Sequence, residues 1–212
     1  MTRCAKILCS ALLALSLSNG NSARADDNKV DLEQIGDSNF IEKVLIEGRG
    51  STATIRQEGS ANRAWAYQYG DNTEITVTQL GRSNVAGFVD SAGSKVKLTS
   101  TGNRNEVQGG VGIDSTFAGT QIGDDNRGSV GGDFKSRGNT ITFEQTGDRN
   151  NAQAIMAGDD NVAKEVQTGS DNRSYSTQIG SGNIFDVNIT GNNSETNNMQ
   201  QGDANRAFVT IR

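Results

Sequence analysis

An eleven-residue repeat runs through most of the chain and limits what the chain can fold into. The segment from Gln57 to Gln68 reads Q-x-G-x-x-N-x-A-x-x-x-Q, and five further units keep this pattern with one change, such as Met156 in place of glutamine. From Gly147 to Gly202 the glycines of the pattern follow one another at intervals of eleven residues. The Q-x-G-x-x-N part recurs at Gln34, Gln121, Gln145, Gln167, Gln178 and Gln200.

A unit of this length predicts one strand and one tight turn, because a helical repeat takes about 33–47 residues. Between Asn172 and Gln178, small polar residues alternate with Arg173, Tyr175 and Thr177. A period of two indicates a β-strand. The glycine and asparagine of each unit supply the turn, since both residue types tolerate a positive φ.

Two units form one rung of two strands, about 22 residues long, and successive rungs can stack in parallel about 4.8 Å apart. Counting from Val30 to Ile211 gives about 17 strands, hence roughly eight rungs and a stack about 40 Å long. We therefore predict an all-β chain in which residues 26–212 form one β-solenoid, or parallel β-helix. It has about eight two-strand rungs built from 11-residue half-repeats.

The composition favours stacked amides over a conventional core. The chain is 33% hydrophobic, against about 45–50% in a typical soluble domain. In stacked rungs an inward amide bonds the amides above and below it, so its burial leaves no donor unpaired. The chain also has no histidine, which removes the usual general base and a common metal ligand. We expect no enzyme activity, no metal and no cofactor.

Residues 1–25 have the pattern of a secretory signal peptide. Arg3 and Lys6 make a basic start, Ile7 to Leu17 is an apolar run, and Ala23 to Ala25 is a small-x-small cleavage site. The apolar run is shorter than the roughly 20 residues that span a membrane. We expect cleavage and secretion, without membrane insertion, and both cysteines leave with the signal peptide.

The predicted mature chain is acidic. Cleavage removes three of the 20 basic residues and none of the 25 acidic ones, so the net charge becomes about −8. A negative chain is a poor partner for nucleic acid, and no stretch is basic and amphipathic enough to favour a membrane surface. The outward charges are expected to act as gatekeepers that slow self-assembly until after export.

Three places depart from the regular pattern. Glycines crowd between Glu106 and Gly138, where we expect a bulge or a loop. Val44 and Ile46 have inward parity only if the preceding turn holds one extra residue. Glu165 has inward parity without an obvious basic partner, which indicates either a soft rung or a slip of register.

The predicted functional residues are those of the ladders and turns and those of the two end strands, for which the sequence leaves no room for a cap. The residues of the two polymerising ends are Val30, Leu32, Ala207, Val209 and Ile211. The ladder and turn residues are Gln34, Gly36, Asn39, Gln57, Gly59, Asn62, Gln68, Gln79, Gly81, Asn84, Gln121, Gly123, Asn126, Gln145, Gly147, Asn150, Gly158, Asn161, Gln167, Gly169, Asn172, Gln178, Gly180, Asn183, Gln200, Gly202 and Asn205.

At these residues the chain resembles the curlin family, the secreted subunits of bacterial curli amyloid fibres. Gln57 to Gln68 matches the family repeat position for position, and the similarity covers nearly all of residues 26–212. The resemblance implies export through the curli secretion pore with its accessory proteins. It also implies assembly with itself and other curlin subunits into extracellular, cell-surface fibres of a biofilm matrix, which serve adhesion and surface attachment.

Two features separate the chain from a typical major subunit. Only Asp26 to Lys29 stand between the predicted signal peptide and the first strand, where major subunits carry a Gly-rich leader. The ending from Ala207 to Arg212 resembles the basic, hydrophobic ending of the minor, nucleating subunits. Fibre body and nucleator are both open at this point, and a monomeric β-solenoid adhesin is a third alternative.

Two groups of outward residues suggest binding. Trp65 and Tyr67 could contact sugars, dyes or a neighbouring fibre, although exposed strand formers are the commoner explanation. The acids of the turns Asp124–Asn126 and Asp159–Asn161 suggest calcium. A structural role of these acids in the turns is favoured, because the calcium-binding repeat G-G-x-G-x-D, which has a period of nine, is absent.

Two further alternatives have less support. The pairs Thr76 with Thr78 and Thr140 with Thr142 suggest an ice-binding face, but they do not recur rung after rung. An enzyme would need paired carboxylates in a cleft, as in a polysaccharide hydrolase. The acids of this chain lie mostly in the repeated turns, which favours a structural role.

Overall fold

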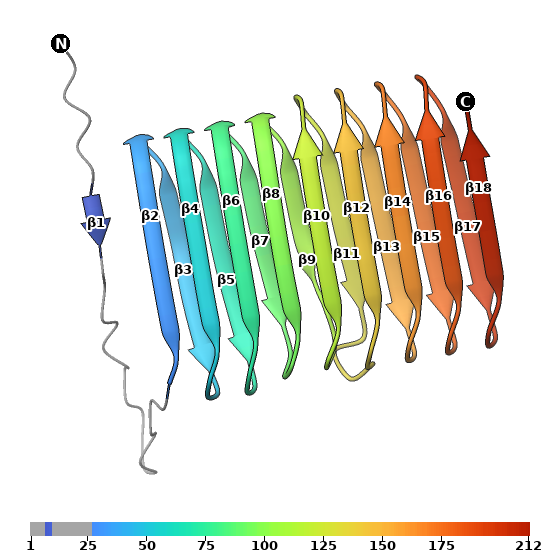
Figure 1. Ribbon diagram of the computed structural model, residues 1–212, viewed down its shortest axis with the longest axis horizontal. Helices are drawn as coiled ribbons and strands as arrows, with labels where there is room; N and C mark the ends of the chain where they lie inside the picture. Colours follow the sequence, from blue (N-terminus) through green and yellow to red (C-terminus); the bar gives the residue numbers. More distant parts are fainter. Residues whose placement is uncertain (1–6, 10–26) are drawn as a thin grey trace.

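The computed structural model describes residues 7–9 and 27–212, which form strands and turns without a helix (Figure 1). From β2 to β18, 17 strands stack into a parallel β-solenoid of about eight turns, which confirms the predicted fold class. The predicted signal peptide, residues 1–25, lies outside the described residues except for β1 (Ile7–Cys9), which pairs antiparallel with β2.

Each strand covers about half of one rung. The bounds are β2 (Lys29–Asp37), β3 (Phe40–Glu47), β4 (Thr52–Ser60), β5 (Arg63–Tyr69), β6 (Glu74–Arg82), β7 (Val85–Asp90), β8 (Lys95–Asn103), β9 (Glu106–Gly110), β10 (Thr116–Ile122), β11 (Arg127–Gly132), β12 (Thr140–Thr146), β13 (Asn151–Ala157), β14 (Val162–Thr168), β15 (Arg173–Ile179), β16 (Ile184–Thr190), β17 (Glu195–Gln201) and β18 (Arg206–Ile211).

The strands alternate between two sheets, so each rung places one strand in each sheet. The even sheet contains β2, β4, β6 and so on to β18, and the odd sheet contains β3, β5 and so on to β17. Equivalent residues lie side by side, as where Gln57 is flanked by Gln34 and Gln79. In Figure 1 the ladder of parallel strands runs from β2 at one end to β18 at the other, beside the C-terminus.

Small and medium side chains fill the space between the two sheets. Alternate residues of most strands are buried, as in β4, where Ile55 and Gln57 are buried and their neighbours are not. Aromatic contacts join Phe117 to Phe88 and to Phe143, with ring centroids 4.8 and 5.4 Å apart. The core is therefore a column in which apolar side chains and amides share the inward positions of each strand.

Glycines with positive φ let the turns stack at close range. Gly59, Gly81 and Gly102 have φ values of 115°, 120° and 113°. A Cβ at each position would collide with the carbonyl oxygen of the equivalent glycine one rung further along. The repeat therefore requires glycine for two reasons, its backbone conformation and the closeness of the next turn.

The extra residue expected near Val44 lies within the strand, and its predicted place in the preceding turn is wrong. The pairing of β3 with β5 shifts between Ile41 and Lys43, which makes Glu42 part of a β-bulge. Val44 and Ile46 then lie beside buried residues of β5, as their parity required. Parity could not place the bulge, because an insertion in the turn or in the strand has the same effect on the residues that follow.

The glycine-rich segment contains shortened strands and a loop. β9 has only five residues, and residues 133–139 separate β11 from β12. The interval from Gly123 to Gly147 exceeds the usual 22 residues by two, and this loop absorbs the excess. The stack is restored at once, because the Asn161 backbone N–H donates to Oδ1 of Asn139 at 2.8 Å.

Replacing Gly81 by alanine should lower the free energy of unfolding by about 3 kcal/mol, because the new Cβ would be strained at φ 120° and would meet the Gly102 carbonyl. The matched control is Gly131→Ala in β11, where an added Cβ meets only Cγ1 of Ile155 at 3.7 Å. Urea unfolding of the two variants checks this. Equal losses of stability would contradict the stacking role of the turn glycines.

Candidate functional site

Buried glutamines form a hydrogen-bonded ladder along the even sheet. The side-chain amide of Gln34 donates to Oε1 of Gln57 at 2.7 Å, and that of Gln57 donates to Gln79 at 2.8 Å. These amides also bond to the facing sheet: Gln121 and Gln145 donate to a ladder neighbour and to the carbonyl of the first residue of an odd strand, and Gln79 donates to the Arg63 carbonyl at 3.0 Å. After Ser100 the ladder resumes, with distances of 2.9 and 2.8 Å, through Gln121, Gln145 and Gln167.

The odd sheet has a much shorter glutamine ladder. Gln178 donates to Oε1 of Gln200 at 2.9 Å. Gln68 does not join a ladder, because it lies between Ile46 and Asp90 in register and donates to a backbone carbonyl of β4. The perfect match from Gln57 to Gln68 could not reveal this, since the neighbours that decide it are about 22 positions away.

Asparagines form a ladder at each of two corners of the solenoid. At one corner, Oδ1 of Asn39 accepts the backbone and side-chain N–H groups of Asn62, both at 3.0 Å. The Asn62 side chain in turn donates to the Gly81 carbonyl at 2.9 Å. The same pattern continues through Asn84, Asn105, Asn126, Asn150 and Asn172. At the other corner it joins Asn139, Asn161, Asn183 and Asn205.

Three asparagines of these corners were not predicted. Asn28 accepts the backbone N–H of Ser51 at 2.9 Å, and Asn105 and Asn139 belong to the ladders described above. Asn105 follows Gly102 at the G-x-x-N spacing, but its unit has Ser100 in place of glutamine. A search for G-x-x-N alone would have found it, and the 22-residue spacing to Asn161 would have found Asn139.

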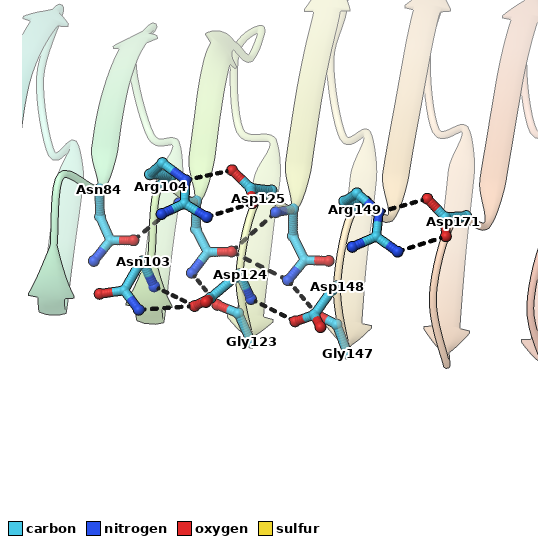
Figure 2. Close-up of polar contacts among 12 residues, drawn as sticks. Asn84, Asn103, Arg104, Gly123, Asp124, Asp125, Gly147, Asp148, Arg149 and Asp171 are labelled. Atoms are coloured by element: carbon cyan, nitrogen blue, oxygen red, sulfur yellow. Dashed lines mark hydrogen bonds and ion pairs between the residues drawn. The ribbon is translucent and has the colours of Figure 1, made fainter.

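The turn acids hold neighbouring turns together. Oδ1 of Asp124 accepts both the backbone and the side-chain N–H of Asn103, at 2.8 and 3.0 Å, and Oδ1 of Asp148 accepts the backbone N–H of Asp124 at 2.9 Å (Figure 2). Asp159 accepts the backbone N–H of Arg137 in the same way. Among the described residues no group of three or more acidic or cysteine side chains could hold a metal ion. These contacts are those of stacked turns.

Arginine and aspartate pairs run beside this row, as Figure 2 shows. Arg104 contacts Asp125 and Arg149 contacts Asp171 through paired hydrogen bonds of 2.6 to 2.8 Å. The hydrogen bond to its arginine lowers the pKa of each aspartate and raises the pKa of each arginine. The pairs are exposed, so they contribute to the register of the rungs more than to stability.

The outward aromatic residues of β5 lie against the sheet. Trp65 covers the backbone of Gly87, and its ring centroid is 5.7 Å from the Arg63 guanidinium. The Lys43 ammonium lies 5.5 Å from the ring of Tyr67. The rings are only partly exposed, and cationic side chains cover part of each. The sugar or dye site considered for them remains a prediction without a formed pocket to support it.

The threonine pairs considered for an ice-binding face do not form an unbroken array. Thr76 lies beside Lys97, and Thr142 lies between Ala118 and Lys164. Charged side chains therefore interrupt the rows along the solenoid axis.

Two buried carboxyl groups interrupt the ladders of the core. Asp90 occupies a glutamine position beside Gln68, and Glu165 lies between Phe143 and Val187 in register. Both are fully buried, and neither forms an ion pair with a described residue. The Asp90 carboxyl accepts no hydrogen bond from a described residue, whereas the Ser174 side chain and the Gln153 backbone partly offset the effect of burial on Glu165. Burial raises the pKa of Asp90 to about 8 and that of Glu165 well above its usual value.

Glu165 marks a soft rung without a slip of register. β14 stays in register with both β12 and β16. The main apolar cluster ends at Ala163, and a separate cluster begins at Phe185. Between them the facing strand β15 contributes the buried polar residues Ser174 and Ser176. The last one and a half rungs, β16 to β18, are therefore joined to the rest by a polar layer.

Both ends of the described solenoid expose strand edges. β17 and β18 each have one strand neighbour, as does β3, while β2 is flanked by β4 and by the short β1. The end residues predicted from the sequence lie there: Val30 and Leu32 are partly buried, as are Ala207, Val209 and Ile211. Such edges carry unpaired N–H and C=O groups that can pair with another chain.

Two surface depressions of the described residues do not have the groups that glycoside hydrolysis requires. One, of about 450 Å³, is lined by four arginines, two asparagines and Asp125, and the other has Glu106 as its single acid. Hydrolases of that kind use two facing carboxylates. No helix that could span a membrane occurs in the described part of the chain.

Part of the chain matches a known protein family. The family model of the curlin associated repeat matches residues 48–81, which span β4, β5 and most of β6. The chain carries a curlin repeat. The match supports assignment to the curlin family, and the curlin repeat suggests a curli-type structural subunit and not an enzyme. Searches of curated proteins and of solved structures found no match.

Because the two buried carboxyl groups have raised pKa values, we expect the free energy of unfolding to fall as the pH rises. The folded chain keeps the Asp90 proton up to about pH 8, whereas an unfolded aspartate releases it near pH 3.8. Stability is therefore lost progressively between these values, at about 1.4 kcal/mol per pH unit for this group. Urea unfolding should show a lower midpoint at pH 9 than at pH 5.

The variant Asp90→Asn removes this titration, so it should be more stable than the parent at pH 9 and less sensitive to pH. Asp186→Asn, an outward-facing change in β16, is the matched control and should keep the pH dependence of the parent. A parent chain that is equally stable at pH 5 and pH 9 would show that the buried carboxyl groups do not act in this way.

Proposed function

We propose that the chain is a secreted curli-type subunit that assembles end to end into extracellular amyloid fibres, which serve biofilm matrix, adhesion and surface attachment. The observation that carries the proposal is the pair of open solenoid ends, each with strand edges and amide ladders that stop without a partner. A second copy of the same chain has the matching spacing of strands and amides. The assembly extends the ladders from molecule to molecule.

Cleavage of residues 1–25 is part of this proposal. The short β1 pairs with the outer edge of β2, so its removal frees that edge for another chain. All 17 strands of the solenoid lie within residues 27–212 and make their pairings without β1. The processed chain is therefore the form to test.

The outward charges suit a subunit that stays soluble until it is exported. Strands on the surface carry lysines and acids, such as Lys97, Lys164 and Asp186, and the processed chain has a net charge of about −8. Charged side chains that flank aggregation-prone strand segments slow unwanted association of chains. Export through a secretion pore with accessory proteins completes the proposed route.

A nucleating role is the second candidate, and the C-terminal strand favours it. β18 carries Phe208, which is 69% exposed, between Arg206 and Arg212. A last strand with an exposed apolar side chain and flanking positive charges could bind the first copy of a separate, acidic major subunit. A monomeric adhesin is the remaining alternative, and it predicts no assembly.

Purified residues 26–212 should assemble into fibres, with a lag that seeds shorten and a meridional diffraction spacing of about 4.8 Å. The same protein is also added in trace amounts to a typical major curlin subunit. Fibres from the pure chain identify a fibre body. Loss of the major subunit's lag, with few fibres from the chain itself, identifies a nucleator, and no assembly in either test contradicts both roles.

Glutamines at the two ends should matter more for polymerisation than a central one. Gln34→Leu and Gln200→Leu remove the amides that face the next molecule, whereas Gln121→Leu removes one that is bonded within the chain. We expect the end variants to slow fibre elongation several-fold more than the central variant. Elongation is measured by the binding of an amyloid dye. Equal effects of all three substitutions on elongation would contradict a special role of the ends.

A further inference from the structure

We propose that successive copies of the chain join with a half-turn about the solenoid axis, so that the even sheet of one copy continues as the odd sheet of the next. This inference rests on the proposed end-to-end assembly and adds its geometry. Its starting point is an odd number of strands. Because 17 strands run from β2 to β18, the even sheet ends half a rung beyond β17, the last odd strand.

An odd number of strands makes the two ways of joining copies unequal. If the next copy were only translated, its β2 would pair with β18, and its β3 would stand about 10 Å from β17 with no strand between them. If the next copy is also rotated by a half-turn, its β2 pairs with β17 and its β3 pairs with β18. Both sheets are then continuous, and the backbone N–H and C=O groups at the edges of β17 and β18 all gain a strand to pair with.

The glutamine ladder favours the half-turn. Gln200 donates one amide proton to the Ile184 carbonyl at 3.0 Å, and no described residue accepts the other. At the opposite end, no described residue donates to Oε1 of Gln34. The half-turn places these two groups side by side, in the direction already set by Gln178 and Gln200. A translated copy would instead place Gln34 beside Ile211 and leave both groups unpaired.

The apolar side chains favour the same arrangement. The last inward residues of the even sheet are Ala207, Val209 and Ile211, which are only partly buried in one copy. With the half-turn they meet the inward aliphatic residues of β3 in the next copy. Those residues are Ile41, Val44 and Ile46. The partly buried apolar residues at the two ends of the core therefore pack against each other in the fibre.

The outward-facing charged residues also favour the half-turn. With Gln200 aligned to Gln34, Glu195 lies beside Lys29 of the next copy. With Ile211 aligned to Ile46, Arg212 lies beside Glu47 of the next copy. A translated copy would bring Arg206 beside Lys29, two like charges on adjacent strands. Backbone, amide, apolar and charged groups thus all select the half-turn.

Excimer fluorescence from pyrene labels can distinguish the two arrangements, because residues 26–212 contain no cysteine. Chains labelled at Met199→Cys are co-assembled with chains labelled at Glu33→Cys, both outward positions next to the end glutamines. A half-turn puts these labels on adjacent strands about 5 Å apart. A translated copy would instead bring Thr210→Cys beside Glu33→Cys.

We expect strong excimer emission from the Met199 and Glu33 pair and only the background level from the Thr210 and Glu33 pair. Each labelled chain assembled alone gives the background, since identical sites lie about 40 Å apart along the fibre. A chain labelled at both Thr177→Cys and Met199→Cys, which are adjacent in register, gives the full signal. Thr210→Cys with Leu45→Cys is a second pair that the half-turn brings together.

Fibres that give excimer from the Thr210 and Glu33 pair would overturn the half-turn, as would fibres with no excimer from any end pair. Electron microscopy of each sample separates this result from failure of the proposed function. If the unlabelled chain forms no fibres at all, end-to-end assembly itself is wrong.

Discussion

A buried amide must find its partners along the solenoid axis, and most other features of the structure follow from that requirement. Gln57 has a glutamine on each side at hydrogen-bonding distance, so its burial costs little. Such a ladder works only if equivalent residues recur at every rung. The repeat of about 22 residues, the stacked turn glycines and the corner asparagines all serve to keep that register.

The same requirement explains where the structure is weak. Asp90 and Glu165 stand at inward positions without a basic partner, and each has a raised pKa because burial disfavours its charge. Glu165 and the serines of β15 also divide the apolar core into two clusters. The C-terminal rungs are thus joined to the rest by a polar layer, at the end where β17 and β18 each have a single strand neighbour.

The repeat was enough to predict the fold class, the number of strands and the stacking of most glutamines and asparagines, because a strict period fixes both parity and register. Features that depend on the residue one rung away were harder to predict. The isolation of Gln68 depends on Ile46 and Asp90, and the bulge at Glu42 is invisible to parity. The loop at residues 133–139 lies where the sequence departs from its pattern, so no period was available to place it.

The central claim is that the hydrogen-bonded ladders within one chain continue between chains. Solid-state NMR of fibres grown from a mixture of chains, one labelled at glutamine nitrogen and the other at carbon, measures contacts between molecules only. The account predicts a contact between the side-chain amide of Gln200 in one chain and the side-chain carbonyl of Gln34 in the next. Fibres without that contact, in which Gln34 instead lies against Ile211, would contradict it.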